Sequence, residues 1–251
     1  MTEGSNQGLL VIVAIIIFGI FVAISYLLFQ DKLHVGLSEI FEDGLEQASD
    51  TLNNTSNIKS EREDETYIYA KIREASPEKN ETEIWVQAEK LKNGTLEIIK
   101  SSIKDADYSS GFKEMTGDLI LPDKIDGKKI TIIGYGAFRF SKFNGNLKLP
   151  VNLITVEEIA FYDSLFIGTL SLPNSLKGID RHSFTKALFT GTFDLKNLNY
   201  IQAYAFLDTN FDRVVNDNIG ISNDSNEERP TKGIHKKSIR MVNGSYYHGK
   251  K

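Results

Sequence analysis

The sequence predicts a solenoid of short β-strands with little helix, built from 23-residue repeats and preceded by one transmembrane α-helix. The first observation is a phrase that recurs at a fixed spacing: Phe143-Asn-Gly-Asn-Leu-Lys-Leu-Pro, Phe166-Ile-Gly-Thr-Leu-Ser-Leu-Pro and Phe189-Thr-Gly-Thr-Phe-Asp-Leu-Lys. The second is an apolar stretch over residues 9–29. Repeats of this length bury their apolar side chains only by stacking on neighbours, so the array predicts a long binding surface rather than a deep reactive pocket.

The apolar stretch predicts a transmembrane helix over residues 9–30, after an N-terminal tip of residues 1–8. At about 1.5 Å per residue it spans roughly 30 Å, the hydrocarbon thickness of a bilayer. The alternative is a cleaved secretory signal, with a small-x-small site at Ala23-Ile24-Ser25. An uncleaved anchor is favoured because no Lys or Arg precedes the stretch and its apolar residues continue to Phe29. The positive-inside rule does not decide the orientation of the helix, because Lys32 is the single Lys or Arg that flanks the span closely.

Two segments connect this span to the rest of the chain. Apolar residues recur at helical spacing among acidic ones, which predicts an acidic juxtamembrane amphipathic helix over residues 31–49: Leu37, Ile40, Phe41 and Leu45. Gly19 and Ala23 in the span permit a homo-oligomer through the N-terminal helix. Residues 50–65 are polar and charged, which predicts a flexible linker.

Residues 66–114 are expected to form a strand-rich N-terminal cap or a degenerate first repeat. Apolar and polar residues alternate there, and Asn93-Gly94 is a turn signal. The solenoid itself is predicted over residues 115–211, where the first unit is longer than the others near Asp126-Gly127, as a surface loop would allow. Residues 212–251 are polar and are expected to be a mobile tail.

The repeated positions have distinct roles. Paired leucines such as Leu170 and Leu172 place two side chains on one face of a short strand, and Pro173 ends that strand. Two rows of aromatic residues are assigned to the core, where rings of successive coils stack: Phe138, Phe161, Phe184 and Phe206 in one, and Phe143, Phe166 and Phe189 in the other.

With these residues in place, the pattern Leu-x-Leu-Pro-x-x-Leu-x-x-Ile/Val-x-x-x-Ala/Ser-Phe, as in residues 170–184, resembles the BspA-like leucine-rich repeats of bacterial surface proteins. The resemblance covers about residues 115–211. It implies a curved leucine-rich solenoid with a role in adhesion or partner recognition. The sequence departs from the pattern at Lys196, which replaces the proline, and at Glu158 and Arg181, where a small residue is frequent.

Several functional classes find no support in the residues. The chain has no cysteine, and its net charge of −5 offers no basic stripe for nucleic acid. His182 occupies a variable repeat position, aligned with Ile159 and Tyr204, and no His/Asp/Glu cluster has metal-ligand spacing. We therefore predict no catalytic, cofactor-binding or metal-binding residues, and an enzyme is the least favoured class.

A partner-binding surface is predicted at the variable positions between the invariant ones. Three such positions lie within the strands and six flank the phenylalanines: Lys148, Ser171 and Asp194, and Arg139, Phe140, Tyr162, Asp163, Tyr200 and Tyr204. Aromatic side chains and arginine are common interface anchors.

The sequence thus predicts a single-pass protein of the bacterial cell membrane, whose extracellular repeat domain binds a protein or another cell-surface macromolecule as an adhesin does. The alternative is a structural or assembly subunit of a membrane or pilus-like envelope complex, because an apolar helix followed by an acidic segment is also suited to that role.

Overall fold

The computed structural model describes residues 17, 18, 20, 57–105, 108, 113–222 and 229–249. The chain divides into two compact units, Met1–Asn53 and Asn54–Lys251. The predicted tip, transmembrane helix and juxtamembrane helix lie outside the described residues, apart from residues 17, 18 and 20, which are helical. No helix within the described part of the chain is long and apolar enough to cross a bilayer.

The second unit is built almost wholly of short strands, with one 3₁₀ turn, η2 (Pro77–Lys79), among its described residues. The strands are β1 (Asn57–Ile58), β2 (Arg62–Glu63), β3 (Tyr67–Arg73), β4 (Ile84–Lys90), β5 (Leu96–Ser102), β6 (Leu119–Ile120), β7 (Lys124–Ile125), β8 (Lys128–Ile133), β9 (Leu147–Lys148), β10 (Thr155–Val156), β11 (Gly178–Ile179), β12 (Thr192–Asp194), β13 (Tyr200–Ile201), β14 (Phe206–Phe211), β15 (Arg213–Val215), β16 (Gly233–Ile234) and β17 (Ile239–Met241).

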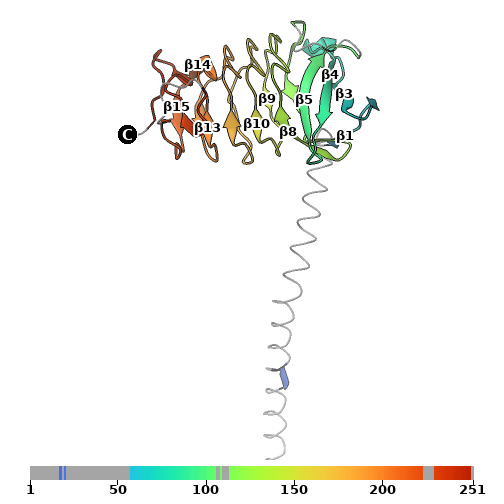
Figure 1. Ribbon diagram of the computed structural model, residues 1–251, viewed down its shortest axis with the longest axis horizontal. Coiled ribbons are helices and arrows are strands. Elements are labelled where there is room, and N and C mark those ends of the chain that lie inside the picture. Colours follow the sequence, from blue (N-terminus) through green and yellow to red (C-terminus); the bar gives the residue numbers. More distant parts are fainter. Residues whose placement is uncertain are drawn as a thin grey trace, which may run out of the picture. The chain divides into compact units, whose positions relative to one another are not determined.

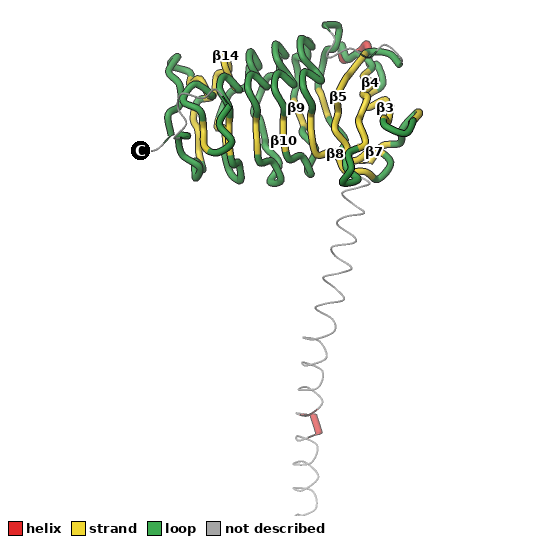
Figure 2. The backbone as a smooth tube through the Cα atoms, viewed as in Figure 1, coloured by secondary structure: helices red, strands yellow, loops and turns green. Residues whose placement is uncertain are grey.

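One long sheet runs the length of this unit in the order β16-β13-β11-β10-β8-β5-β4-β3-β2, as Figures 1 and 2 show. Its pairs from β16 to β5 are parallel, and those from β5 to β2 are antiparallel. Val156 pairs with both Ile133 and Ile179, and Ile201 continues the same row. Successive coils therefore stack in register, as the repeats predict.

Two ladders of phenylalanine rings fill the interior between the coils. Phe161 is fully buried and stacks on Phe138 at 5.4 Å and on Phe184 at 5.1 Å between ring centroids. In the second ladder Phe166 stacks on Phe143 at 5.3 Å and on Phe189 at 6.0 Å. Both rows belong to one continuous core, so the assignment of these rings to core is confirmed.

The glycines of the recurring phrase lie side by side. The amide of Gly145 donates to the carbonyl of Gly117 at 3.2 Å, and the carbonyl of Gly145 accepts from Ile167 at 3.1 Å. Gly168 and Gly191 have left-handed backbone angles, with φ of 75° and 77°. A side chain at these positions would be strained, which explains why glycine recurs.

At the N-terminal end, the segment expected to be strand-rich contains β3, β4 and β5, which cap the first coil. The structure differs from the predicted flexible linker, because β1 pairs with β7 and β2 pairs with β3 within residues 57–65. The extra residues of the first unit form a hairpin between β7 and β8, with left-handed angles at Asp126 and Gly127. Polar composition did not prevent order here, since the backbone of β1 and β2 pairs with β7 and β3.

At the C-terminal end, the structure also differs from the predicted mobile tail. Strand β16 extends the long sheet beyond β13, and Ile234 and Ile239 are buried in the common core. Phe206 donates its amide to Ser238 at 2.8 Å, as equivalent residues do between earlier coils. Residues 229–249 thus contribute a further coil, whose spacing departs from the 23-residue period and hides it in the sequence.

Candidate binding surface

Four successive coils make the same turn between their strand in the long sheet and their second phenylalanine. Two residues of this turn have left-handed backbone angles, for example His182 (φ 57°) and Lys186 (φ 69°). Neighbouring coils repeat them at Gly136, Ile159 and Tyr204, and at Phe140, Asp163 and Asp208. Amides of this turn bond to the next coil, as from Phe140 to the carbonyl of Tyr162 at 2.6 Å. The turn is therefore firmly held, and its side chains form rows along the solenoid.

Aromatic side chains of four successive turns form one continuous row. Phe140 meets Tyr162 edge to face at 5.7 Å, and Tyr162 meets His182 at 6.1 Å. His182 stacks on Tyr204 at 5.0 Å, with 15° between the ring planes. Phe140 is 40% exposed, and the other three are partly exposed. We refer to Phe140, Tyr162, His182 and Tyr204 as the aromatic edge.

Cations lie on the rings of this edge. Arg139 lies 5.7 Å from the ring of Phe140, Lys186 lies 5.8 Å from Tyr162, and Lys237 lies 5.9 Å from Tyr204. Such contacts are each worth about 0.5–1 kcal/mol at exposed sites. They fix the lysine and arginine stems across the rings, so the edge presents positive charge together with apolar surface.

Asp163 connects three coils beside the aromatic edge. Its carboxylate pairs with Lys142 at 3.1 Å and with Lys186 at 3.3 Å. Partial burial raises the pKa of Asp163, but the hydrogen bonds from the two lysines outweigh it and hold that pKa below its usual range. The carboxylate thus stays ionised and holds the two ammonium groups in place.

The structure divides the nine predicted surface residues among three faces. Arg139, Phe140, Tyr162, Asp163 and Tyr204 come together at the turn just described. Lys148 and Asp194 belong to β9 and β12 of the short sheets, and Ser171 is their equivalent in the coil between. This strand row lies on a different side of each coil from the aromatic edge.

Tyr200 lies on neither of these faces, because β13 places it on the outer side of the long sheet. Its ring covers Gly178 of the preceding coil so closely that a β-carbon there would overlap it. Burial, followed by the charge of Asp180, raises the pKa of the Tyr200 hydroxyl. Tyr200 is thus a structural cover for the glycine rather than an exposed anchor.

The outer side of the long sheet also carries acidic residues. Burial, together with the charges of Glu157 and Glu89, raises the pKa of Glu97 to about 7. Glu157 is fixed by accepting a hydrogen bond from the amide of Tyr135 at 3.0 Å. Within the described part of the chain, no group of three or more His, Cys, Asp or Glu could hold a metal ion.

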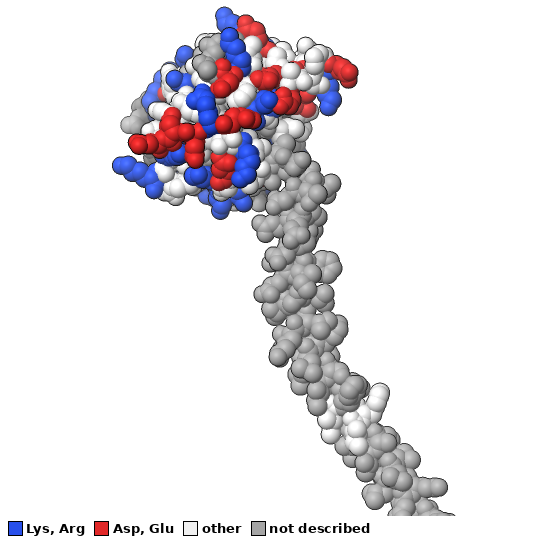
Figure 3. Space-filling view, turned by 90° about the vertical axis from the view of Figure 1, so that its right-hand side faces the viewer, with Lys and Arg blue, Asp and Glu red and all other residues white. Residues whose placement is uncertain are grey.

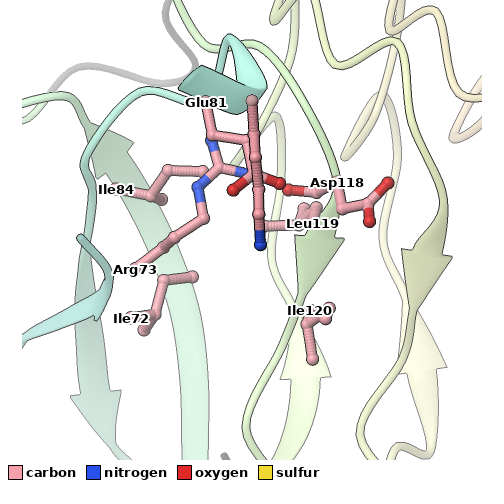
Figure 4. A pocket seen from close by; sticks show the side chains of 8 residues that line it. Ile72, Arg73, Glu81, Ile84, Asp118, Leu119 and Ile120 are labelled. Carbon is pink, nitrogen blue, oxygen red and sulfur yellow. The ribbon is translucent and has the colours of Figure 1, made fainter. Parts of the chain in front are cut away.

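A pocket of about 270 Å³ lies where the cap meets the first coil. Figure 4 shows Arg73 reaching from β3 toward Asp118, with Ile72 and Ile120 on opposite sides of the space. The guanidinium of Arg73 donates to the carbonyls of Thr116 and Asp118, beside β6. Burial lowers the pKa of Arg73. This site joins the cap to the solenoid.

The surface of the cap carries both signs of charge. Figure 3 shows Lys and Arg interspersed with Asp and Glu over this end. Arg62 of edge strand β2 pairs with Asp105 at 3.1 Å, and Glu63 pairs with Lys90 at 2.8 Å. Charges on an edge strand discourage pairing with another sheet, so this end of the sheet is protected against extension by a further strand.

The geometry defines a repeat solenoid with an aromatic surface row, and comparison with known families agrees. The family model described as BspA type Leucine rich repeat region matches residues 120–225, in six copies. Residues 120–225 are therefore similar to leucine-rich repeats of the BspA type, a kind of module that typically binds proteins and has no catalytic role of its own. No curated protein and no solved structure matches the chain.

Sequence reasoning placed Phe140, Tyr162 and Tyr204 on the surface but did not join them, and it left out His182, Lys186 and Lys237. The available signal was the alignment of His182 with Tyr204 at one repeat position. Two planar rings at equivalent positions of successive coils can stack on each other. The ring centroids of His182 and Tyr204 are 5.0 Å apart.

Proposed function

We propose that this protein is a membrane-anchored surface protein whose repeat region binds a macromolecular partner outside the cell, as an adhesin does. The observation that carries the proposal is the aromatic edge with its associated cations. Tyrosine and arginine dominate the energy of protein interfaces, and side chains that are already ordered lose little entropy on binding. The firmly held turn supplies that order.

Anchoring to the membrane rests on the sequence of residues 9–30, which are apolar and long enough to span a bilayer. Protease treatment of intact cells tests both location and orientation. The proposal expects loss of the repeat domain from intact cells and retention of the remaining fragment in the membrane fraction. Release of the whole protein by an alkaline wash, without detergent, would contradict the anchor.

The binding role is tested by comparing two sets of substitutions in the full chain. Phe140→Ala with Tyr162→Ala alters the aromatic edge, whereas Lys148→Ala with Ser171→Ala alters the strand row as a matched control. Cells carrying the first pair are expected to lose attachment to a partner-bearing surface, while the control pair retains it. Equal attachment by both variants, with unchanged thermal unfolding, would refute the role of the edge.

Purification in mild detergent separates this proposal from the assembly-subunit alternative. A free surface binder is expected to purify without stoichiometric companions until partner is added. A constant stoichiometric companion, retained by the variant with Phe140→Ala and Tyr162→Ala, would instead favour a subunit of an envelope complex.

A further inference from the structure

The aromatic edge lies in a zone of positive charge, although the whole chain has a net charge of −5. Arg139, Lys186 and Lys237 lie on its rings, and Lys142 lies beside it. Two carboxylates lie among these cations: Asp163 is shared by Lys142 and Lys186, and Asp208 pairs with a further cation, Arg240. The positive charge is therefore only partly neutralised. A surface of this sign attracts an anionic partner and repels a cationic one.

The arrangement of the rings restricts which anionic partner fits. Tyr204 lies between His182 of the preceding coil and Lys237 of the following one. Lys186 lies 5.8 Å from the centroid of the Tyr162 ring, which also meets Phe140 and His182 in T-shaped contacts. The rings of Tyr162 and Tyr204 thus already have aromatic and cationic neighbours, so stacking of a sugar or a base on them is disfavoured. Ring edges, a phenol hydroxyl and ammonium groups remain to meet a ligand.

Exposed aliphatic side chains continue the surface from the same turns. Leu188, which directly precedes Phe189 in its turn, is 42% exposed, and Leu165 at the equivalent position of the preceding coil is partly exposed. Apolar side chains beside fixed cations suit a partner that carries both carboxylates and apolar groups. A glycan or an anionic lipid headgroup would use the cations and leave these aliphatic groups without a complement.

We infer that the aromatic edge and its neighbouring cations bind an acidic polypeptide segment that also carries apolar side chains. This inference rests on the proposed binding function and names the chemistry of its partner. The carboxylates of the segment would meet Lys186, Lys237 and Arg139, while its apolar side chains would contact Phe140, Leu165 and Leu188. Affinity should fall as salt rises, but only in part, because the apolar contacts are insensitive to screening.

The test uses the full chain in detergent and three probes: a random copolymer of glutamate and tyrosine, polyglutamate, and heparin. The copolymer is expected to bind at least tenfold more tightly than polyglutamate of equal charge. Reversing two cations, Lys186→Glu with Lys237→Glu, should weaken copolymer binding at least tenfold. Lys92→Glu with Lys129→Glu makes the same change of charge at two exposed positions away from the edge, and it should change the affinity less than twofold.

Two results would overturn the inference. One is tighter binding of heparin than of the copolymer, lost in the same Lys186 and Lys237 variant, since that result assigns the surface to an anionic glycan. The other is unchanged copolymer binding by that variant when its thermal unfolding matches the wild type. Either result leaves the proposed function standing if cells still attach through Phe140 and Tyr162, and the cell assay therefore distinguishes the two failures.

Discussion

Replacing Phe161 by alanine tests the stacked core most severely. This ring is fully buried, stacks on Phe138 at 5.4 Å and Phe184 at 5.1 Å, and meets Phe166 edge to face at 5.8 Å. Removing a buried phenylalanine costs about 3–5 kcal/mol. The upper part of that range is expected, because the two neighbouring coils cannot close the gap without breaking their hydrogen-bond register.

A loss of this size should lower the melting temperature by about 6–20 °C for a domain of this length. The assay is thermal unfolding followed by circular dichroism, with Phe140→Ala as the matched control. Phe140 is 40% exposed and stands outside the ladders, so its loss should cost below about 1 kcal/mol, as is usual for surface positions. Equal melting temperatures for the Phe161 and Phe140 variants would refute the stacked-ladder account.

Three further predictions follow from contacts outside the ladders. Arg73→Ala should destabilise the protein by about 2–3 kcal/mol and speed amide hydrogen exchange in β6. Arg73→Lys should restore only part of the lost stability. Unchanged amide exchange in the alanine variant would contradict the role of Arg73 in joining the cap to the solenoid. The pKa of Glu97 lies near 7 in the folded state, so between about pH 4.5 and pH 7 the folded state holds a proton that the unfolded chain releases, and stability should fall as pH rises through that range. Chemical unfolding should show a weaker dependence of stability on pH for Glu97→Gln than for the wild type. An identical pH dependence would exclude Glu97 as the source. Gly178→Ala should destabilise the protein by about 1–3 kcal/mol through overlap with Tyr200. The double variant Gly178→Ala with Tyr200→Ala should lose less stability than the sum of the two single losses. Strict additivity of the free energies of unfolding in urea would show that the two residues do not compete for space.

The periodic part of the fold could be predicted from the sequence because each repeated residue has a local reason. Gly168 recurs for its left-handed angle, and Phe161 and Phe184 recur because only stacked rings fill the coil. The ends of the solenoid could not be predicted in this way. Ile234 and Ile239 fall outside the regular period. Residues 57–65 acquire order because β1 pairs with the distant strand β7 and β2 pairs with the neighbouring strand β3.

The binding surface shows the same division between local and spatial information. The repeat pattern placed Tyr162 and Tyr204 at variable, surface positions, and this agrees with their partial exposure. It could not separate them from Tyr200, because that requires knowing which side of β13 faces Asp180. Nor could it include His182, whose position matters only once successive turns are stacked.

The central claim is that the protein meets its partner through the aromatic edge. A photo-crosslinking amino acid placed at Tyr162 in the full chain, on the cells that make it, tests this most directly, with Ser171 of the strand row as the comparison position. The account predicts a crosslinked partner of one defined mass from position 162 and little or none from position 171. Crosslinking confined to position 171, or equal at both, would contradict it.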